Sequence, residues 1–199
     1  AGLTGVKAAL EKRGMELAGE GTYTRNTTAV KGAVVAIKKS NPDAIVTVGA
    51  YKPIAEFIRT AKKVGLDVPI LNISFTGSKA LAKDLGAEGE GIIITQVVPF
   101  PFDTSLPLVA DYQKALTAYK ADAEPGFVSL EGYMVGKLAA QALAKVDGDL
   151  NRESFLDAFA ATGSFDLGGV SLTYGADDNQ GMDDVFLTSI QADGSFKAL

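Results

Sequence analysis

Apolar residues follow two alternating spacings along this chain. Stretches rich in β-branched residues, typical of buried strands, alternate with stretches where apolar residues recur every three or four positions, as on one face of a helix. The pattern predicts strands at Leu17–Thr24, Ala44–Val48, Pro69–Ile73, Gly91–Val98, Val170–Tyr174 and Val185–Gln191, and helices near Leu3–Leu10, Val30–Ile37, Pro53–Val64, Lys79–Leu85, Leu106–Lys120, Phe127–Val146 and Arg152–Ala161. This alternation predicts an α/β fold with a doubly wound, mostly parallel sheet covered on both faces.

Several helix boundaries carry side chains that can cap a helix. Asn26–Thr28 offers N-cap oxygens to the second predicted helix, Ser78 to the helix that begins at the next residue, and Asn151 to the last helix. The longest predicted helix contains Gly132 and Gly136, and small residues on a helix face permit close approach of another element. We therefore expect that helix to pack in an interior.

The pattern of alternating strands and helices changes at Pro99–Phe100–Pro101. Two prolines around an aromatic residue cannot continue a central strand, because proline donates no hydrogen bond to a sheet. We therefore expect the chain to cross to a second lobe at Pro99, Phe100 and Pro101.

The first predicted element is a helix, whereas a doubly wound lobe usually begins with a strand that is central in its sheet. Without that strand, roughly five backbone positions in the sheet would lack hydrogen-bond partners, and each unsatisfied buried group costs about 1–3 kcal/mol. This cost rivals the whole stability of a domain, about 5–15 kcal/mol. The topology therefore predicts that the chain needs a missing N-terminal segment, as a non-covalent fragment, or a second copy through chain exchange.

Composition and charge exclude several functions. The net charge is −5 without a block of like charges, which argues against a nucleic-acid partner. The chain has no cysteine and no histidine, so disulfides, zinc–thiolate sites, a Ser–His–Asp triad and a histidine phosphorelay are excluded. No apolar run approaches the length of a membrane span. We expect neither a metal nor another cofactor.

Two glycine-rich stretches and one acidic loop resemble binding motifs only superficially. The glycines of Gly86–Gly91 and Gly163–Gly169 do not lie between a strand and a helix with dinucleotide-binding spacing. The loop Asp177–Gly181 lacks the alternating acidic spacing and terminal glutamate of a calcium-binding loop, so a solvated turn is favoured.

The candidate binding residues follow two neighbouring predicted strands. Ala50 and Tyr51 come after Ala44–Val48, and Ser74, Phe75 and Thr76 come after the next strand. Parallel strands share their carboxyl ends, where open α/β sheets bind ligands. Tyr51 is equally well explained as a loop tyrosine packed on its own surface, and for Thr76 a turn or capping role is favoured.

Three ordered segments resemble those of type I periplasmic binding proteins, most of all the branched-chain amino-acid-binding group that serves ABC transporters. The segments are NPDAIVTVGAYKPIAEFIRTAKKVGLDVPILNISF, EGEGIIITQVVPFP and PGFVSLEGYMVGKLAAQAL, and the resemblance runs along nearly all 199 residues. It implies a two-lobed, non-enzymatic receptor that closes about a hinge on a small ligand. Residues 1–98 would form most of the second lobe, 99–101 the hinge crossing, 102–180 the C-terminal part of the first lobe, and 181–199 terminal strands returning towards the hinge.

The same resemblance implies partners and residue roles. A small-molecule ligand and an ABC-transporter permease would be the partners, and the location would be periplasmic or extracellular, with a lipid anchor conceivable in a full-length parent. Tyr51 matches a tyrosine that contacts the ligand in amino-acid-binding relatives. Ser74 stands where those relatives carry a glutamate that accepts the ligand's ammonium group, so a carboxylate, aromatic acid or amide becomes a serious candidate ligand.

Two other functional classes stay open from the sequence. One is a ligand-sensing regulatory domain of the same fold, which a fused signalling domain or neighbouring genes would reveal. The other is a cytosolic α/β enzyme that uses Asp, Glu or Lys chemistry, although no paired carboxylates gather at the predicted sheet edge.

Overall fold

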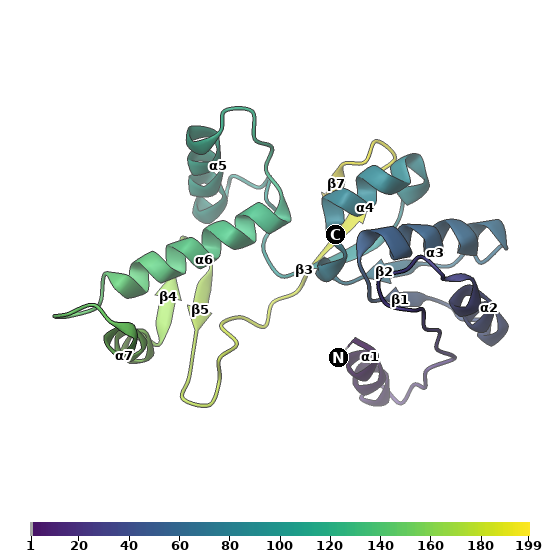
Figure 1. The fold of residues 1–199 in the computed structure, drawn as a ribbon, viewed down its shortest axis with the longest axis horizontal. Coiled ribbons are helices and arrows are strands. Elements are labelled where there is room, and N and C mark those ends of the chain that lie inside the picture. The colour runs from purple at the N-terminus through teal and green to yellow at the C-terminus, as the bar shows by residue number, and fades with distance from the viewer. Residues whose placement is uncertain (1) are drawn as a thin grey trace. The chain divides into compact units, whose positions relative to one another are not determined.

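The computed structural model describes residues 2–199 and divides into two compact units (Figure 1). Unit 1 contains the chain up to Gln96 together with Leu187–Leu199, and unit 2 contains Val97–Phe186. Unit 2 is therefore inserted into unit 1, and the chain passes between the two units twice.

Unit 1 is an α/β unit built on a five-stranded sheet (Figure 1). Its helices are α1 (Gly2–Glu11), α2 (Lys31–Ser40), α3 (Tyr51–Lys63) and α4 (Ser78–Leu85), with 3-10 turns η1 (Ser74–Thr76) and η2 (Gly86–Gly89). Its strands are β1 (Ile45–Thr47), β2 (Ile70–Asn72), β3 (Ile93–Gln96), β6 (Phe186–Ile190) and β7 (Phe196–Ala198). The strand order is β1-β2-β3-β6-β7.

The core of unit 1 lies between its sheet and helices. Strands β1, β2 and β3 are parallel, while β6 and β7 pair antiparallel. Helix α3 packs against both α2 and α4. Ile58, Leu81, Ile94 and Ile190 are fully buried in this cluster. The buried residues of the β-branched runs thus pack against apolar side chains of the covering helices.

One predicted strand does not form. Residues 17–24 have no strand pairing, so the prediction of a strand at Leu17–Thr24 is wrong for this structure. A strand exists only when its backbone groups find a neighbouring strand. Within residues 2–199, the sheet ends at β1 and no strand joins β1 to this segment.

Two predicted helix caps are also wrong, and one is confirmed. Helix α2 begins after Val30 without a side-chain cap, because Thr27 Oγ1 accepts instead from the Ala29 N–H at 3.3 Å. Gly77 is the N-cap of α4, and the Ser78 hydroxyl bonds elsewhere. At the start of α7 (Arg152–Thr162), Asn151 forms the expected cap as part of a reciprocal capping box with Ser154.

Unit 2 is mainly helical. It contains α5 (Pro107–Tyr119), α6 (Phe127–Leu143), α7 (Arg152–Thr162) and the antiparallel pair β4 (Ser164–Asp166) and β5 (Ser171–Thr173). Leu108, Tyr112, Leu130 and Leu167 are buried at its centre. The Tyr112 hydroxyl accepts from the Gly126 N–H at 2.9 Å, which ties α5 to the start of α6.

Helix α6 does not pack tightly along its small residues as the sequence predicts. A Cβ atom built on Gly132 or Gly136 meets nothing within 4 Å among the described residues. Val128 and Val135 on the same helix are largely exposed. The helix instead buries Phe127, Leu130, Met134 and Ala142 in unit 2.

Candidate functional site

The first candidate loop leaves the carboxyl end of β1. After Val48, Gly49 allows a close approach of the Tyr23 hydroxyl, because a Cβ at this glycine would collide with that oxygen and with Ile54. Ala50 is the exposed N-cap of α3, with φ −71° and ψ 158°, and Tyr51 is the first residue of the helix. The loop is therefore short, and close contacts at Gly49 and the start of α3 restrict its backbone.

Tyr51 has two kinds of neighbour. Its partly buried ring packs against the hydrophobic cluster of unit 1, and the Lys52 Nζ lies 6.0 Å from the ring centroid. Part of the side chain thus has the packing role considered for it, while the remaining part is accessible to solvent. A ligand that meets this residue would contact a ring already held in place by the core.

The second candidate loop leaves the carboxyl end of β2 as η1. The Ser74 N–H donates to the Thr95 Oγ1 at 3.3 Å, which anchors the turn to β3. Phe75 is 71% exposed, whereas Thr76 is 2% exposed. The Thr76 Oγ1 has no hydrogen-bond partner among the described residues. Of the three residues, Phe75 therefore offers the largest accessible surface to a ligand.

The sheet brings the two loops to one edge of unit 1. Thr47 and Asn72 are register partners in the parallel pair β1–β2, and neighbouring strands lie about 4.8 Å apart. Ala50 and Tyr51 follow the first of these residues, and Ser74 and its neighbours follow the second. The predicted grouping of these residues at the carboxyl edge therefore agrees with the strand order.

Sequence reasoning missed a buried polar pair beneath this edge. Thr47 Oγ1 donates to the Leu71 carbonyl at 3.2 Å and contacts Asn72 Oδ1. Asn72 is 1% exposed, and its Nδ2 has no partner within the described residues. The available signal was a polar residue near the carboxyl end of two otherwise apolar strands. Such a pair pins the register of β1 against β2 just before the candidate loops.

The residues predicted as a hinge lie in unit 2, immediately after the first crossing. Pro99 and Pro101 are buried, and the half-buried Phe100 ring packs on Phe127 at a centroid distance of 6.2 Å. The Pro101 carbonyl accepts from Gln113 Nε2 at 2.9 Å. This segment is thus firmly packed within its own unit.

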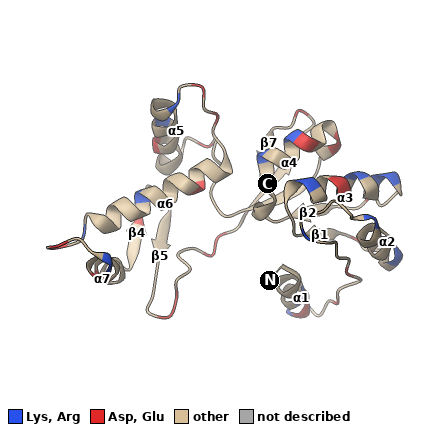
Figure 2. Ribbon diagram, viewed as in Figure 1, with Lys and Arg blue, Asp and Glu red and all other residues tan. Residues whose placement is uncertain are grey.

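Charged groups are dispersed over both units (Figure 2). Within residues 2–199, no group of three or more acidic residues could hold a metal ion. The hydrogen bonds that Arg59 donates to the carboxylates of Asp84 and Glu88 raise the pKa of Arg59. The N–H groups of Gly168 and Gly169 donate to the Asp166 carboxylate and lower its pKa. These are contacts that join helices and turns, so they support the fold.

Between residues 2 and 199, no helix is both apolar enough and long enough to cross a membrane.

Unit 1 has parallel strands covered by helices, and two loops lie at the carboxyl edge of its sheet. These features define the open α/β class, whose members bind ligands at that edge. A family model described as periplasmic binding protein matches residues 1–195. The chain therefore belongs to the periplasmic binding protein family, and its fold is the type I fold of that family.

Solved structures support this assignment. A possible leucine/isoleucine/valine-binding protein from Rhodopirellula baltica SH 1 is 37% identical, with a TM-score of 0.85 over 90% of this chain and 49% of that one. A substrate-binding periplasmic protein from Ralstonia solanacearum is 24% identical, with a TM-score of 0.84 over 98% and 56%. A leucine-binding protein from Thermotoga maritima MSB8 is 22% identical, with a TM-score of 0.74 over 89% and 49%. The last two likenesses concern the fold alone.

This chain spans about half the length of the solved structures that it matches. A search among curated proteins found no match.

Proposed function

We propose that this chain is part of an extracytoplasmic solute receptor that binds a small polar ligand and delivers it to an ABC-transporter permease. The observation that carries the proposal is the pair of loops at the carboxyl edge of unit 1 in a member of the periplasmic binding protein family. Tyr51, Ser74 and Phe75 would contact the ligand, with Ala50 and Thr76 shaping the loops. The protein would act as a binding protein and not as an enzyme.

The proposed mechanism is closure of two lobes about a hinge at the crossing that directly precedes Pro99–Pro101. The chain crosses between its two units at Gln96–Val97 and returns at Phe186–Leu187, so a rotation would be absorbed by two short segments. The ligand would stabilise the closed state to the extent that it binds this state more tightly than the open one. Periplasmic or extracellular location follows from this role.

Ser74 bears on the chemistry of the ligand. A serine hydroxyl carries no charge, whereas a carboxylate that binds an ammonium group contributes about 1.5–3 kcal/mol. At about 1.4 kcal/mol for each tenfold change in affinity, an amino acid would lose about ten- to a hundredfold at this position. We therefore favour a carboxylate, an aromatic acid or an amide over leucine itself.

Calorimetric titration tests the proposal with leucine, benzoate and benzamide as probes. In a full-length receptor that contains this chain, we expect benzoate or benzamide to bind more tightly than leucine. We expect the 199-residue chain to bind weakly, because much of the proposed cleft would belong to the rest of the receptor. Tyr51→Ala should weaken binding, while Tyr119→Ala, at a side chain 89% exposed in unit 2, should not. Equal affinities in the 199-residue chain and the longer receptor would contradict the proposed cleft.

Substitution of Ser74 tests the ligand argument separately. Ser74→Glu should raise the affinity for leucine by about ten- to a hundredfold, because it restores a countercharge for the ammonium group. Ser74→Gln is the matched control, since it has nearly the same size without the charge. A similar gain from both variants would show that the charge is irrelevant.

A further inference from the structure

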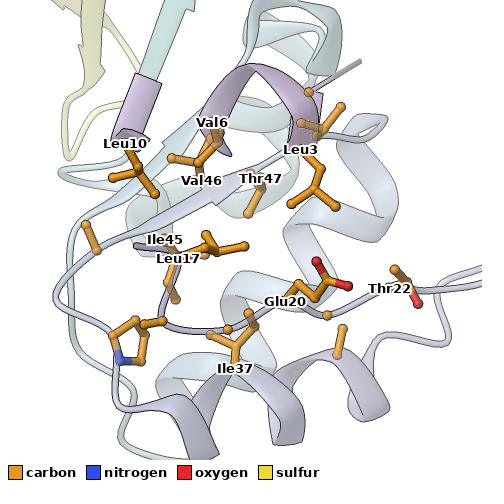
Figure 3. A pocket seen from close by; sticks show the side chains of 18 of the residues that line it. Leu3, Val6, Leu10, Leu17, Glu20, Thr22, Ile37, Ile45, Val46 and Thr47 are labelled. Atoms are coloured by element: carbon orange, nitrogen blue, oxygen red, sulfur yellow. The ribbon is translucent and has the colours of Figure 1, made fainter. Parts of the chain in front are cut away.

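The Asp–Gly dipeptides of this chain lie away from the pocket of unit 1. That pocket has a volume of about 410 Å³, and Leu3, Val6 and Leu10 are among its mostly apolar lining residues (Figure 3). The dipeptides Asp147–Gly148 and Asp193–Gly194 lie instead in surface turns, outside every helix and strand.

An Asp–Gly dipeptide can react with itself. The backbone nitrogen of the glycine can attack the side-chain carboxyl carbon of the aspartate, because this attack closes an unstrained five-membered ring. Glycine has no Cβ that hinders the approach, and it adopts many backbone conformations. The nitrogen and the carboxyl group must be free to meet, so hydrogen bonds that hold either group oppose the reaction.

Asp147 and Gly148 lie in the loop between α6 and α7, which projects beyond the ends of both helices (Figure 1). Both residues are exposed. Within residues 2–199, neither the Asp147 carboxylate nor the Gly148 N–H has a hydrogen-bond partner. A Cβ built on Gly148 would meet nothing within 4 Å, so the surroundings leave room for the ring to close.

Asp193 and Gly194 lie in the turn between β6 and β7, where both reacting groups are held. The Gly194 N–H donates to the Gln191 carbonyl at 2.9 Å, and the Asp193 carboxylate accepts from the Ser195 N–H at 2.9 Å. Hydrogen bonds from the Ser195 hydroxyl and N–H lower the pKa of Asp193, which keeps its carboxylate ionised. The φ angles of the two glycines are nearly equal, +80° here and +79° at Gly148, so the hydrogen bonds distinguish the two sites.

We infer that Asp147–Gly148 is a site of spontaneous succinimide formation that converts Asp147 to isoaspartate, and that Asp193–Gly194 is protected by its turn. The reactants are two groups of this chain and water. The inference does not depend on the ligand or on the proposed cleft.

The conversion takes place in two balanced steps. In the first, the Gly148 nitrogen loses its proton to solvent and attacks Cγ of the protonated Asp147 side chain. A C–N bond forms, and the carboxyl hydroxyl leaves with a proton from solvent as water. In the second, water adds to either carbonyl of the ring. Addition at Cγ breaks the new C–N bond and restores aspartate, whereas addition at the main-chain carbonyl breaks the original peptide bond and leaves the chain connected through Cβ and Cγ.

The product changes the loop while atomic composition and charge stay the same. Isoaspartate lengthens the main chain by one carbon, and the former main-chain carboxyl becomes the side chain. The Asp149 carbonyl follows shortly after and accepts from the Ser154 hydroxyl at 2.9 Å, which ties this loop to the capping box of α7. The fraction of molecules with an altered loop before α7 therefore rises with the age of the folded protein.

Peptide mapping of the folded 199-residue protein tests the inference. The protein is kept for several weeks at neutral pH and body temperature. Trypsin then releases residues 146–152, and chymotrypsin releases residues 188–196. Chromatography separates the isoaspartyl form of each peptide, and electron-transfer fragmentation identifies it. We expect isoaspartate to accumulate at Asp147 at least about tenfold faster than at Asp193, because the turn must first break its hydrogen bonds.

Unfolding and substitution separate the effect of structure from that of local sequence. In concentrated urea, where the turn between β6 and β7 is lost, the two sites should convert at similar rates. Asp147→Glu should abolish conversion at this position, because the longer side chain cannot close the same ring. Ser195→Ala removes one hydrogen bond to the Asp193 carboxylate, so it should raise conversion at Asp193 and leave Asp147 unchanged.

Three results would overturn the inference. They are isoaspartate at neither dipeptide of the folded protein, equal accumulation at Asp147 and Asp193, and a preference for Asp147 that persists unchanged in urea. The last result would assign the difference to the neighbouring residues in the sequence and not to the fold.

Discussion

Gln96 gives the sharpest test of how unit 1 is held together. It is 1% exposed at the end of β3, and its Nε2 donates to the Ser78 Oγ and the Thr188 Oγ1, each at 3.0 Å. Thr188 in turn donates to the Ile94 carbonyl at 3.2 Å. One side chain thus joins β3, the start of α4, and β6, which returns to the sheet 92 residues later.

The cost of removing this amide can be worked from these contacts. Gln96→Leu keeps most of the volume but removes two hydrogen bonds, at about 1 kcal/mol each, and leaves the buried Ser78 hydroxyl without a partner, at about 1–3 kcal/mol. We expect a loss of about 3–5 kcal/mol in the free energy of unfolding. Thr188→Val should cost about 1–2 kcal/mol. The double variant should be about 1 kcal/mol more stable than the sum of the two losses predicts, because the shared bond is lost once.

Urea unfolding followed by circular dichroism provides the free energies, and hydrogen exchange at the Ile94 amide reports on unit 1 specifically. Gln113→Leu is a control, because it removes an amide hydrogen bond within unit 2 and should leave exchange at Ile94 unchanged. Losses from Gln96→Leu and Thr188→Val that add to within about 0.3–0.5 kcal/mol would refute the coupling.

Substitutions at three other positions probe local contacts by urea or acid titration. Arg59→Ala should cost about 1 kcal/mol, since it removes partly exposed ion pairs to Asp84 at 2.8 Å and to Glu88 at 3.0 Å; an unchanged urea midpoint would contradict this. Asn151→Ala should cost about 1 kcal/mol through loss of the α7 cap, and Asn151→Gly markedly less. The pKa of Asp166 is lowered in the folded state, so its ionised carboxylate stabilises the fold. This contribution is fully present above about pH 4 and is lost as the pH falls through the folded-state pKa. Asp166→Asn should therefore make the free energy of unfolding depend less steeply on pH in the acid range.

The sequence predicted the parallel part of the sheet because its signal is local. The β-branched runs around β1, β2 and β3 and the glycines that follow helices are visible without any knowledge of neighbours. The strand expected at Leu17–Thr24 failed because strand formation depends on a partner, which no short pattern contains. Ser78 failed as a cap for a similar reason, since its hydroxyl is engaged by Gln96, a residue from another element. Strands β4 and β7 are three residues long and were missed.

The candidate site was predictable to the level of its sheet edge. The rule that parallel strands share carboxyl ends placed Tyr51 and Ser74 just after two neighbouring strands, and the strand order agrees. The exposure of Phe75 and the burial of Thr76 within one turn could not be deduced, because both depend on how η1 sits on β3. The Thr47–Asn72 pair could be identified only from the register of β1 against β2, which the folded sheet supplies.

The insertion of unit 2 between β3 and β6 sets an order of events during synthesis. At about 5–20 residues per second, the 92 residues that separate Gln96 from Thr188 take roughly 5–18 s to be made. During that interval unit 2 is synthesised while β3 lacks its β6 neighbour. The pairing of β3 with β6 can therefore form only after every residue of unit 2 has been synthesised.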